Sequence, residues 1–201
     1  MKTSKIDLPR SIKRGEEFFI LQKEKQSVRI EGEGYVLREL SYSDCDSLSE
    51  NADNEKIWNN LMDHFPHPYT KRDAFDYISM VKATPGRPTR LAIDVDGKAV
   101  GCIGFSSEGD IEKVTAEIGY WIGEKYWGHG IMYKVLKDVT EYAFRHFHYA
   151  KVYALVFSYN PASMHVLEKA GYQLEAVLHK AAVKNGQLID FYYYSKMREE
   201  A

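Results

Sequence analysis

The 201-residue chain is 44% hydrophobic and 28% charged, which is the balance of an ordinary globular protein and favours a single domain. A formal net charge of -2 and a pI near 6.4 give no support for nucleic-acid binding, which usually makes a domain basic. No stretch approaches the ~18 apolar residues of a membrane-spanning helix, and no secretory signal is visible near the N-terminus. We therefore expect neither a nucleic-acid nor a membrane partner.

The chain has two cysteines, Cys45 and Cys102, and neither has the spacing of a disulfide scaffold or a zinc site. Two such thiols fit a reducing compartment, so we expect a cytoplasmic protein. Cys102 stands in an apolar run and is predicted to be a buried core residue. His64 and His67 lie in a proline-rich loop without a carboxylate or thiol partner, so we expect no metal site.

Residues 1–33 mix charges closely and lack clear periodicity. Phe18–Leu21 and Val28–Ile30 could each form a short strand, but the segment favours an irregular N-terminal extension. Two glycines then punctuate the start of a more regular pattern. We therefore predict that the domain spans residues 34–201.

The first part of this domain is predicted to hold one strand followed by helices. Tyr35–Leu40 has a strand pattern, and residues 43–62 have a helical one, in two short pieces with a break near Asn51. Thr70 is a helix N-cap candidate, and it precedes a helix predicted over Lys71–Lys82.

Strand patterns dominate from residue 89 onward. Arg90–Val95 and Lys98–Phe105 flank Asp96-Gly97, a two-residue sequence that is typical of a hairpin turn. Val114–Ile122 follows a charged turn and is predicted to be the third strand of an antiparallel set.

The last part alternates helices with strands and ends in a strand pair. The predicted elements are a helix from Gly130 to Phe147, a strand from Val152 to Ser158, a helix from Ala162 to Ala170 closed by Gly171, and strands over Tyr172–Lys184 and Gln187–Met197. Asn185-Gly186 between the final strands is a strong hairpin signal. The whole order predicts one mixed α/β domain without an internal repeat.

Gly128 and Gly130 lie between a predicted strand and a predicted helix. Backbone N–H groups at a helix N-terminus attract anions, and glycines let a diphosphate approach the backbone without Cβ collisions. Taken alone, two glycines at this position are equally typical of a tight strand–helix turn.

Three longer motifs extend this observation, and they occur in order on the expected elements. They are Lys125-x-x-Gly128-x-Gly130, the preceding Glu117-Ile118-Gly119-Tyr120-Trp121-Ile122, and the segment from Asn160 to Tyr172 with Ser163 and Gly171 within it. Together they resemble the pyrophosphate loop, fourth strand and following helix of GNAT acetyltransferases. The Asn160–Tyr172 segment is similar to the RimJ/RimL branch, whose enzymes acetylate the N-terminal amine of ribosomal proteins. The likeness covers about residues 34–197.

This resemblance implies a GNAT acyl-CoA N-acyltransferase fold, with a mixed, mostly antiparallel twisted sheet of about seven strands and helices on both faces. It implies acetyl-CoA as co-substrate and a fourth and fifth strand that splay apart to admit the pantetheine arm. The backbone of two residues would hold that arm, Asn160 would bind it by its amide, and a loop would cradle the pyrophosphate. The implied residues are Trp121 and Ile122 for the arm, and Lys125, Trp127, Gly128, His129, Gly130, Ile131 and Met132 for the loop.

By motif match, Ser163 is the candidate acid that protonates the departing CoA thiolate, and Glu117 is the candidate base, acting through water. The N–H of Ile122 would polarise the thioester carbonyl. Each has a structural alternative: Asn160 or Ser163 would cap the helix that follows, and Glu117 would be a solvated or salt-bridged strand carboxylate.

Four aromatic residues and the acidic Asp190 are predicted to line the acceptor site: Trp58, Phe65, Tyr69 and Tyr194. Helical packing would explain Trp58 equally well. Sequence leaves three functions open. The chain is a protein Nα-acetyltransferase, an acetyltransferase for a small amine such as a polyamine, amino acid or antibiotic, or a non-catalytic acyl-CoA-binding module. A homodimer is compatible with the family, and no residue specifies its interface.

Overall fold

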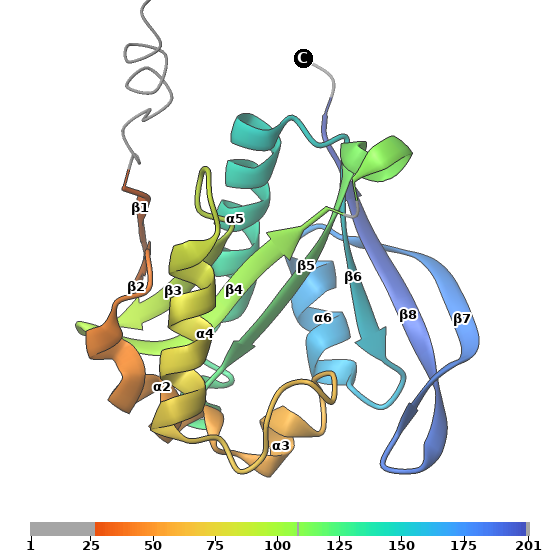
Figure 1. The fold of residues 1–201 in the computed structure, drawn as a ribbon. Helices are drawn as coiled ribbons and strands as arrows, with labels where there is room; N and C mark the ends of the chain where they lie inside the picture. Colours follow the sequence, from red (N-terminus) through yellow and green to blue (C-terminus); the bar gives the residue numbers. More distant parts are fainter. Residues whose placement is uncertain (1–26, 108, 200–201) are drawn as a thin grey trace, which may run out of the picture.

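The computed structural model describes residues 27–107 and 109–199, so the strand considered over Phe18–Leu21 lies outside the described residues. The described chain forms one open sheet of eight strands in the order β1-β2-β3-β4-β5-β6-β8-β7 (Figure 1). All neighbouring strands are antiparallel except β5 and β6, which run parallel. The predicted mixed, mostly antiparallel sheet is therefore confirmed.

The strands follow the predicted pattern closely. Their bounds are β1 Arg29–Gly32, β2 Tyr35–Arg38, β3 Arg90–Val95, β4 Lys98–Ser106, β5 Thr115–Ile122, β6 Lys151–Phe157, β7 Gln173–Lys184 and β8 Gln187–Met197. Both predicted hairpin turns are present: Asp96-Gly97 joins β3 to β4, and Asn185-Gly186 joins β7 to β8. All four of these turn residues have positive φ, which asparagine, aspartate and glycine tolerate better than other residues.

Helices cover both faces of the sheet (Figure 1). Their bounds are α2 Cys45–Ala52, α3 Glu55–Trp58, α4 Lys71–Ala83, α5 Ile131–Phe147 and α6 Pro161–Lys169. One core cluster joins α5 and α6 to the sheet and includes Leu136, Ile118 and Ala154. A second cluster lies on the opposite face, where Leu48 of α2 and Ile78 of α4 pack on the sheet with the buried Cys102.

Capping explains why the helices begin where they do. Thr70 and Asp73 form a reciprocal capping box at the start of α4, as predicted for Thr70. The expected break in the helix over residues 43–62 falls at Asp53 and Asn54, and the Asn54 side chain caps the short α3 by accepting from two backbone N–H groups. Sequence therefore located the helices, and the caps set their ends.

The sheet has one strand more than the seven expected. β1 pairs with β2 from Arg29↔Arg38 to Gly32↔Tyr35, so the irregular interpretation of residues 1–33 is wrong for Arg29–Gly32. Three of the four side chains are charged or absent, which hides the period-two signal of a strand. The backbone pairing, together with burial of the adjacent Val28, holds this segment on the sheet.

An ion-pair network fixes α2 beside the sheet. The Arg38 guanidinium donates to both carboxylate oxygens of Asp44 at 2.8 Å and to Asp94 at 2.7 Å. Bidentate pairing of this kind adds geometric specificity to the charge attraction, so α2 keeps a fixed relation to strands β2 and β3.

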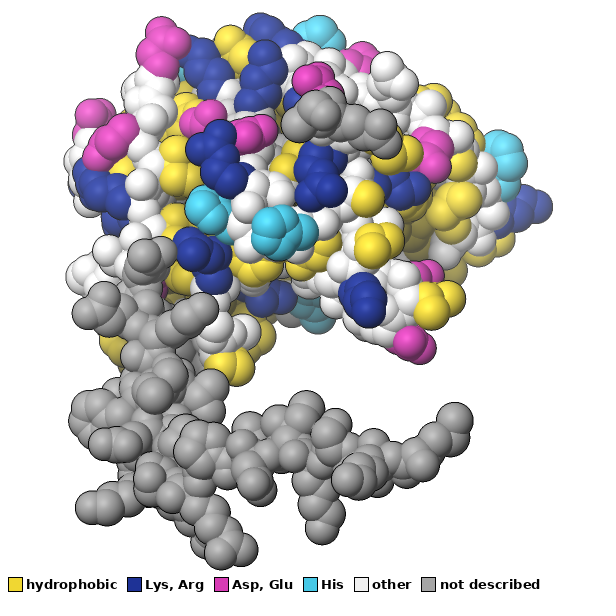
Figure 2. Space-filling view, turned by 90° about the horizontal axis from the view of Figure 1, so that it is seen from above, with side chains coloured by type: hydrophobic (Ala, Val, Ile, Leu, Met, Phe, Trp, Pro, Cys, Tyr) yellow, Lys and Arg dark blue, Asp and Glu magenta, His cyan; other side chains and the backbone are white. Residues whose placement is uncertain are grey.

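Basic and acidic side chains are interspersed on the face seen from above in Figure 2, and no single basic patch dominates that face. This agrees with the small net charge of the chain. Within residues 27–107 and 109–199, no helix is long and apolar enough to cross a membrane.

Candidate active site

The ladder between β5 and β6 is incomplete. The two parallel strands pair over only three positions, Thr115–Glu117 with Lys151–Tyr153. Beyond Glu117 they diverge, while the opposite edge of β5 stays paired with β4 as far as Ile122 (Figure 1). Backbone groups of β5 therefore face an opening in the middle of the sheet, as the predicted splay requires.

The register decides which backbone groups face this opening. The Gly123 N–H donates to the Val100 carbonyl at 2.8 Å, which directs it toward β4. Because N–H groups alternate in direction along a strand, the Trp121 backbone also faces β4, whereas Tyr120 and Ile122 face β6. Of the two backbone positions expected to hold the pantetheine arm, Ile122 faces the opening and Trp121 does not; Tyr120 faces it as well.

A glycine-containing loop connects this opening to α5. Gly128 and Gly130 have φ values of +77° and +72°, which L side chains rarely adopt. Gly130 is the N-cap of α5 and supplies no side-chain cap, so the first-turn N–H groups have no side-chain acceptor there. The Trp127 indole N–H donates to the Ile122 carbonyl at 2.8 Å and fixes the loop to the end of β5.

The other predicted loop residues lie around this turn in different roles. His129 is exposed, and Ile131 and Met132 form the start of α5, with the Met132 side chain buried in the core. The Lys125 ammonium contacts Glu50 of α2 at 3.3 Å and lies over the Tyr126 ring. Met132 therefore fills core space, and the exposed Lys125 is tied to α2.

Ser163 lies in the first turn of α6, on the α5/α6 face of the sheet. The Asn160 side-chain oxygen accepts from the Ser163 N–H at 3.1 Å, which is the N-cap bond foreseen as a structural alternative. This cap uses the amide oxygen of Asn160 and not its nitrogen. The Ser163 hydroxyl is 2.8 Å from the Tyr120 hydroxyl, so α6 is linked directly to β5 at the opening.

Glu117 lies on the opposite face of the sheet, at the last position where β5 pairs with β6. Ala116 and Ile118 point into the α5/α6 core, so the alternation of side chains directs Glu117 to the α2/α4 face. Its cross-strand neighbour Tyr153 stacks on Tyr193 with ring centroids 4.7 Å apart. Burial, and to a smaller extent the negative charge of Glu117, raises the pKa of Tyr193.

Three aromatic rings form a continuous wall on the α2/α4 face. The Phe65 ring lies 4.9 Å from Tyr69 and 5.9 Å from Trp121, measured between centroids. Tyr69 is buried, and its backbone N–H donates to Asp53 at 2.9 Å, which fixes the loop before α4. The structure thus brings together Phe65 and Tyr69, as predicted, and adds the Trp121 side chain to them.

Trp58 stacks on His67, with ring centroids 5.4 Å apart, and takes part in a contact between α3 and the β7–β8 hairpin. The ammonium group of the buried Lys184 lies 4.0 Å from the centre of the Trp58 ring. It donates hydrogen bonds to the Asp63 carboxylate at 2.8 Å and to the Leu61 carbonyl at 3.0 Å. Asn185 donates to Asn59 at 2.8 Å across the same contact. The hairpin tip therefore closes over the loop that carries the aromatic wall.

Tyr194 and Asp190 are not part of this wall. Tyr194 is buried on the α5/α6 face, where its hydroxyl donates to Glu168 of α6 at 2.9 Å. Asp190 accepts from the Lys180 N–H and contacts the His179 ring within the β7–β8 hairpin. The expectation that Tyr194 lies together with Phe65 and Tyr69 is wrong, because side-chain alternation along β8 turns it toward α6 on the opposite face.

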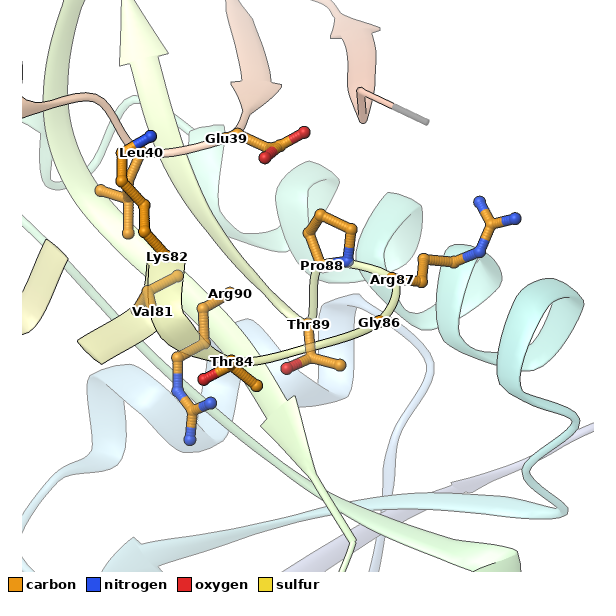
Figure 3. A pocket seen from close by; sticks show the side chains of 10 residues that line it. All are labelled: Glu39, Leu40, Val81, Lys82, Thr84, Gly86, Arg87, Pro88, Thr89 and Arg90. Carbon is orange, nitrogen blue, oxygen red and sulfur yellow. The ribbon is translucent and has the colours of Figure 1, made fainter. Parts of the chain in front are cut away.

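The pocket in Figure 3 lies elsewhere in the molecule, between the end of α4 and the residues after β2, with Lys82, Arg87 and Arg90 among its lining. It contains none of the predicted site residues. The opening between β5 and β6 is defined by the point where their backbone pairing stops, and it is separate from this pocket. No cluster of three or more metal-ligating side chains occurs among the residues described.

These features fit coenzyme A. Tyr120 and Ile122 present backbone groups along the opening, as an added strand would require. The Gly128–Gly130 turn and the uncapped first turn of α5 present N–H groups where a diphosphate would bind, next to the positive end of the helix dipole. Asn160 and Ser163 lie at the N-terminus of α6, on the same face of the sheet as α5.

A family model described as "Acetyltransferase (GNAT) domain" matches residues 35–173, which is more than half of the chain. The chain is a GNAT acetyltransferase. The match contains β5, the glycine turn and α6, so it covers every element that forms the opening.

Named relatives agree with this assignment. The uncharacterized N-acetyltransferase p20 of Bacillus licheniformis is 27% identical over 175 residues, or 84% of this chain and 95% of the relative. The solved structure of RimL, a ribosomal L7/L12 α-N-protein acetyltransferase in complex with coenzyme A, has a TM-score of 0.73 at 22% identity, covering 85% of this chain and 98% of that one. The microcin C7 self-immunity acetyltransferase MccE, solved with acetyl-CoA and AMP, has a TM-score of 0.72 at 22% identity. The match covers 83% of this chain and 94% of MccE.

Sequence reasoning missed two features of this GNAT site. One is the Tyr120–Ser163 hydroxyl pair, whose members are 43 positions apart. The other is the Lys184 contact with Asp63, 121 positions apart. A signal existed for Tyr120, since it alternates with Glu117 to the opposite face of β5, whereas no local pattern marks Lys184.

Proposed function

We propose that this GNAT enzyme transfers the acetyl group of acetyl-CoA to the N-terminal α-amine of a protein. The observation that carries the proposal is the opening between β5 and β6, which has Ser163 on one face and Glu117 on the other. The likeness to RimL, which its name describes as an α-N-protein acetyltransferase, supports a protein terminus as acceptor. Two free cysteines support a cytosolic location.

Each face has its own chemical task. On the α5/α6 side, backbone groups of Tyr120 and Ile122 align the pantetheine arm, and the Asn160 amide nitrogen binds it. On the α2/α4 side, the wall of Phe65, Tyr69 and Trp121 orients the acceptor. Holding both reactants in fixed geometry supplies a large part of the rate, since well-oriented groups react at effective concentrations of ~10⁵ M or more.

Proton movement follows the same division. An alkylammonium must lose a proton before it attacks, and Glu117 accepts that proton through a water molecule. The Ile122 N–H stabilises the negative charge that develops on the thioester oxygen. The amine nitrogen bonds to the carbonyl carbon and the carbon–sulfur bond breaks, while the remaining extra proton on the nitrogen passes to solvent. Ser163 donates a hydrogen bond to the departing thiolate and stabilises its charge.

The test is release of free CoA thiol from acetyl-CoA in the presence of matched acceptors. One panel holds peptides with a free N-terminus and the same peptides with that terminus blocked; a second holds polyamines, amino acids and aminoglycosides. We expect release only with free peptide termini. Release confined to one small amine would contradict the protein acceptor, and acetyl-CoA binding without release in either panel would contradict catalysis.

The pH profile separates the kinds of amine. An α-amine has a pKa of about 7.7–8.0 and a lysine side chain about 10.4. For an α-amine acceptor we expect kcat/KM to rise with pH and level off near pH 8, whereas a lysine acceptor would keep it rising for about two further units.

A further inference from the structure

The structure contains two pairs of tyrosine and aliphatic hydroxyls on the α5/α6 side. Tyr120 and Ser163 are 2.8 Å apart, and Tyr172 and Thr140 are 2.6 Å apart. Burial raises the pKa of both tyrosines, so both phenols keep their protons at neutral pH. The pairs are therefore chemically alike and differ in their surroundings.

The Tyr172–Thr140 pair is complete within the core. Thr140 is 1% exposed and its hydroxyl donates to the Leu136 carbonyl at 2.6 Å, so Tyr172 donates to Thr140. In the Tyr120–Ser163 pair, the described residues offer the Ser163 hydroxyl no partner other than Tyr120. One hydroxyl proton of this second pair thus has no acceptor among residues 27–107 and 109–199, and Ser163 contacts β5 where its pairing with β6 has stopped.

Elementary acidity decides which proton that is. A phenol is a much stronger acid than an aliphatic alcohol and hence the better hydrogen-bond donor. Tyr120 therefore donates to the Ser163 oxygen, and the Ser163 proton is directed elsewhere. A hydroxyl that accepts one hydrogen bond becomes a stronger donor in the next, because bonds in a chain polarise one another.

We propose that Tyr120 is a positioning residue for leaving-group stabilisation: its phenol orients and polarises Ser163, whose proton then points at the CoA sulfur in the opening. The inference rests on the proposed function and adds a residue to it. Tyr120 keeps its own proton throughout. The alternative is purely structural, in which the hydroxyl pair only ties α6 to β5.

The experiment measures the pKa of the thiol in bound CoA from the ultraviolet absorbance of its thiolate as the pH is raised. It needs no acceptor amine. A donor to the thiolate favours the charged form and lowers the thiol pKa, so loss of the donor raises it. We expect Ser163→Ala to raise the pKa by about one unit and Tyr120→Phe by about half a unit, with CoA affinity within about twofold of the parent.

Two further variants separate positioning from structure. Tyr172→Phe removes the same oxygen from the core pair, and we expect it to lower the melting temperature at least as much as Tyr120→Phe without changing the thiol pKa. In the Ser163→Ala background, Tyr120→Phe should have no further effect on that pKa, because the Ser163 hydroxyl through which Tyr120 acts is absent. A fluorinated tyrosine at position 120 is a stronger donor and should shift the thiol pKa downward.

An unchanged thiol pKa in Tyr120→Phe, or a shift that adds in full to that of Ser163→Ala, would overturn the inference. If Tyr120→Phe does not fold, an unchanged pKa with the fluorinated residue would overturn it equally. Failure of the proposed function is a separate result, seen as no thiol release in the acceptor panels. A parent chain that does not bind CoA would overturn both.

Discussion

The two edges of strand β5 differ over the same stretch of residues. Toward β4, pairing continues from Glu117 to Ile122, and Gly101 lies so close to the Trp121 carbonyl that a Cβ there would be 2.3 Å from its oxygen. Toward β6, pairing stops at Glu117. One edge is closed by backbone. On the other, the Tyr120 backbone and the Ile122 N–H have no partner among the described strands, and the Ile122 carbonyl accepts from the Trp127 indole.

The proposed site for acetyl-CoA follows from this difference between the two edges. Buried backbone groups need partners, so a strand edge left open inside a sheet has to be satisfied by solvent or by a bound molecule. The open edge of β5 lies between Ser163 on one face of the sheet and Glu117 on the other. Pairing with β4 along the closed edge holds β5 in place. Four predictions test this comparison.

The largest effect is expected from Glu117→Gln, which removes the carboxylate at the position where β5 and β6 stop pairing. We expect kcat to fall by about 100-fold with acetyl-CoA affinity unchanged, because a positioned base contributes about 10²–10⁴. Glu112→Gln, an exposed carboxylate before β5, is the matched control and should retain full activity. Steady-state kinetics and calorimetric titration measure the two quantities; full activity in Glu117→Gln would remove its role as base.

The second prediction compares two glycines on the paired strands. A Cβ on Gly119 meets nothing within 4 Å, and this position lies between Glu117 and Trp121 on the acceptor face. Gly119→Leu should leave stability intact and raise the acceptor KM at least about tenfold by filling that space, with acetyl-CoA affinity retained. Gly101→Ala, at the closed edge, should instead cost about 1–3 kcal/mol of stability, seen in denaturant titration. Loss of stability in Gly119→Leu with an unchanged acceptor KM, together with a raised KM in Gly101→Ala, would show that the acceptor binds elsewhere.

The local geometry of the candidate site was predictable, because its motifs are local. Gly128, Gly130, Asn160 and Ser163 lie in a turn and a helix start, whose geometry depends on a few neighbouring residues. The hairpin turns were predictable for the same reason.

The remainder depended on pairing register and distant contacts. The direction of the Trp121 backbone and the face of Tyr194 each follow from which residues pair across strands, and a shift of one residue would reverse both. Lys184 reaches Trp58 only because the last hairpin folds back over α3. No local pattern encodes these relations.

The third prediction concerns the glycine turn at the end of the open edge. Gly128→Ala and Gly97→Ala place a Cβ at similar positive φ values, +77° and +80°, with nothing within 4 Å of either, so both should lose about 1 kcal/mol of stability. Gly128→Ala alone should weaken acetyl-CoA binding, by about tenfold, because the diphosphate approaches the backbone there. Equal affinities in the two variants would contradict the role of the loop.

The smallest effect is expected at low pH. Hydrogen bonds from Lys56, and then from Asn54, hold the pKa of Glu124 below its ordinary value of 4.5 and tie the loop after β5 to α3. Stabilisation by the carboxylate is complete above the ordinary value and is lost as the pH falls through the lower folded-state pKa. The melting temperature should fall slightly more on acidification in the parent than in Glu124→Gln, and parallel curves would show that the contact contributes nothing.

The central claim is that acetyl-CoA binds along the open edge of β5. Residue-resolved amide hydrogen exchange, measured with and without acetyl-CoA, tests it most directly. We expect strong new protection of the Tyr120 and Ile122 N–H groups, and little change at Trp121, whose N–H already faces β4. Protection that appears elsewhere while Tyr120 and Ile122 exchange as before would contradict it.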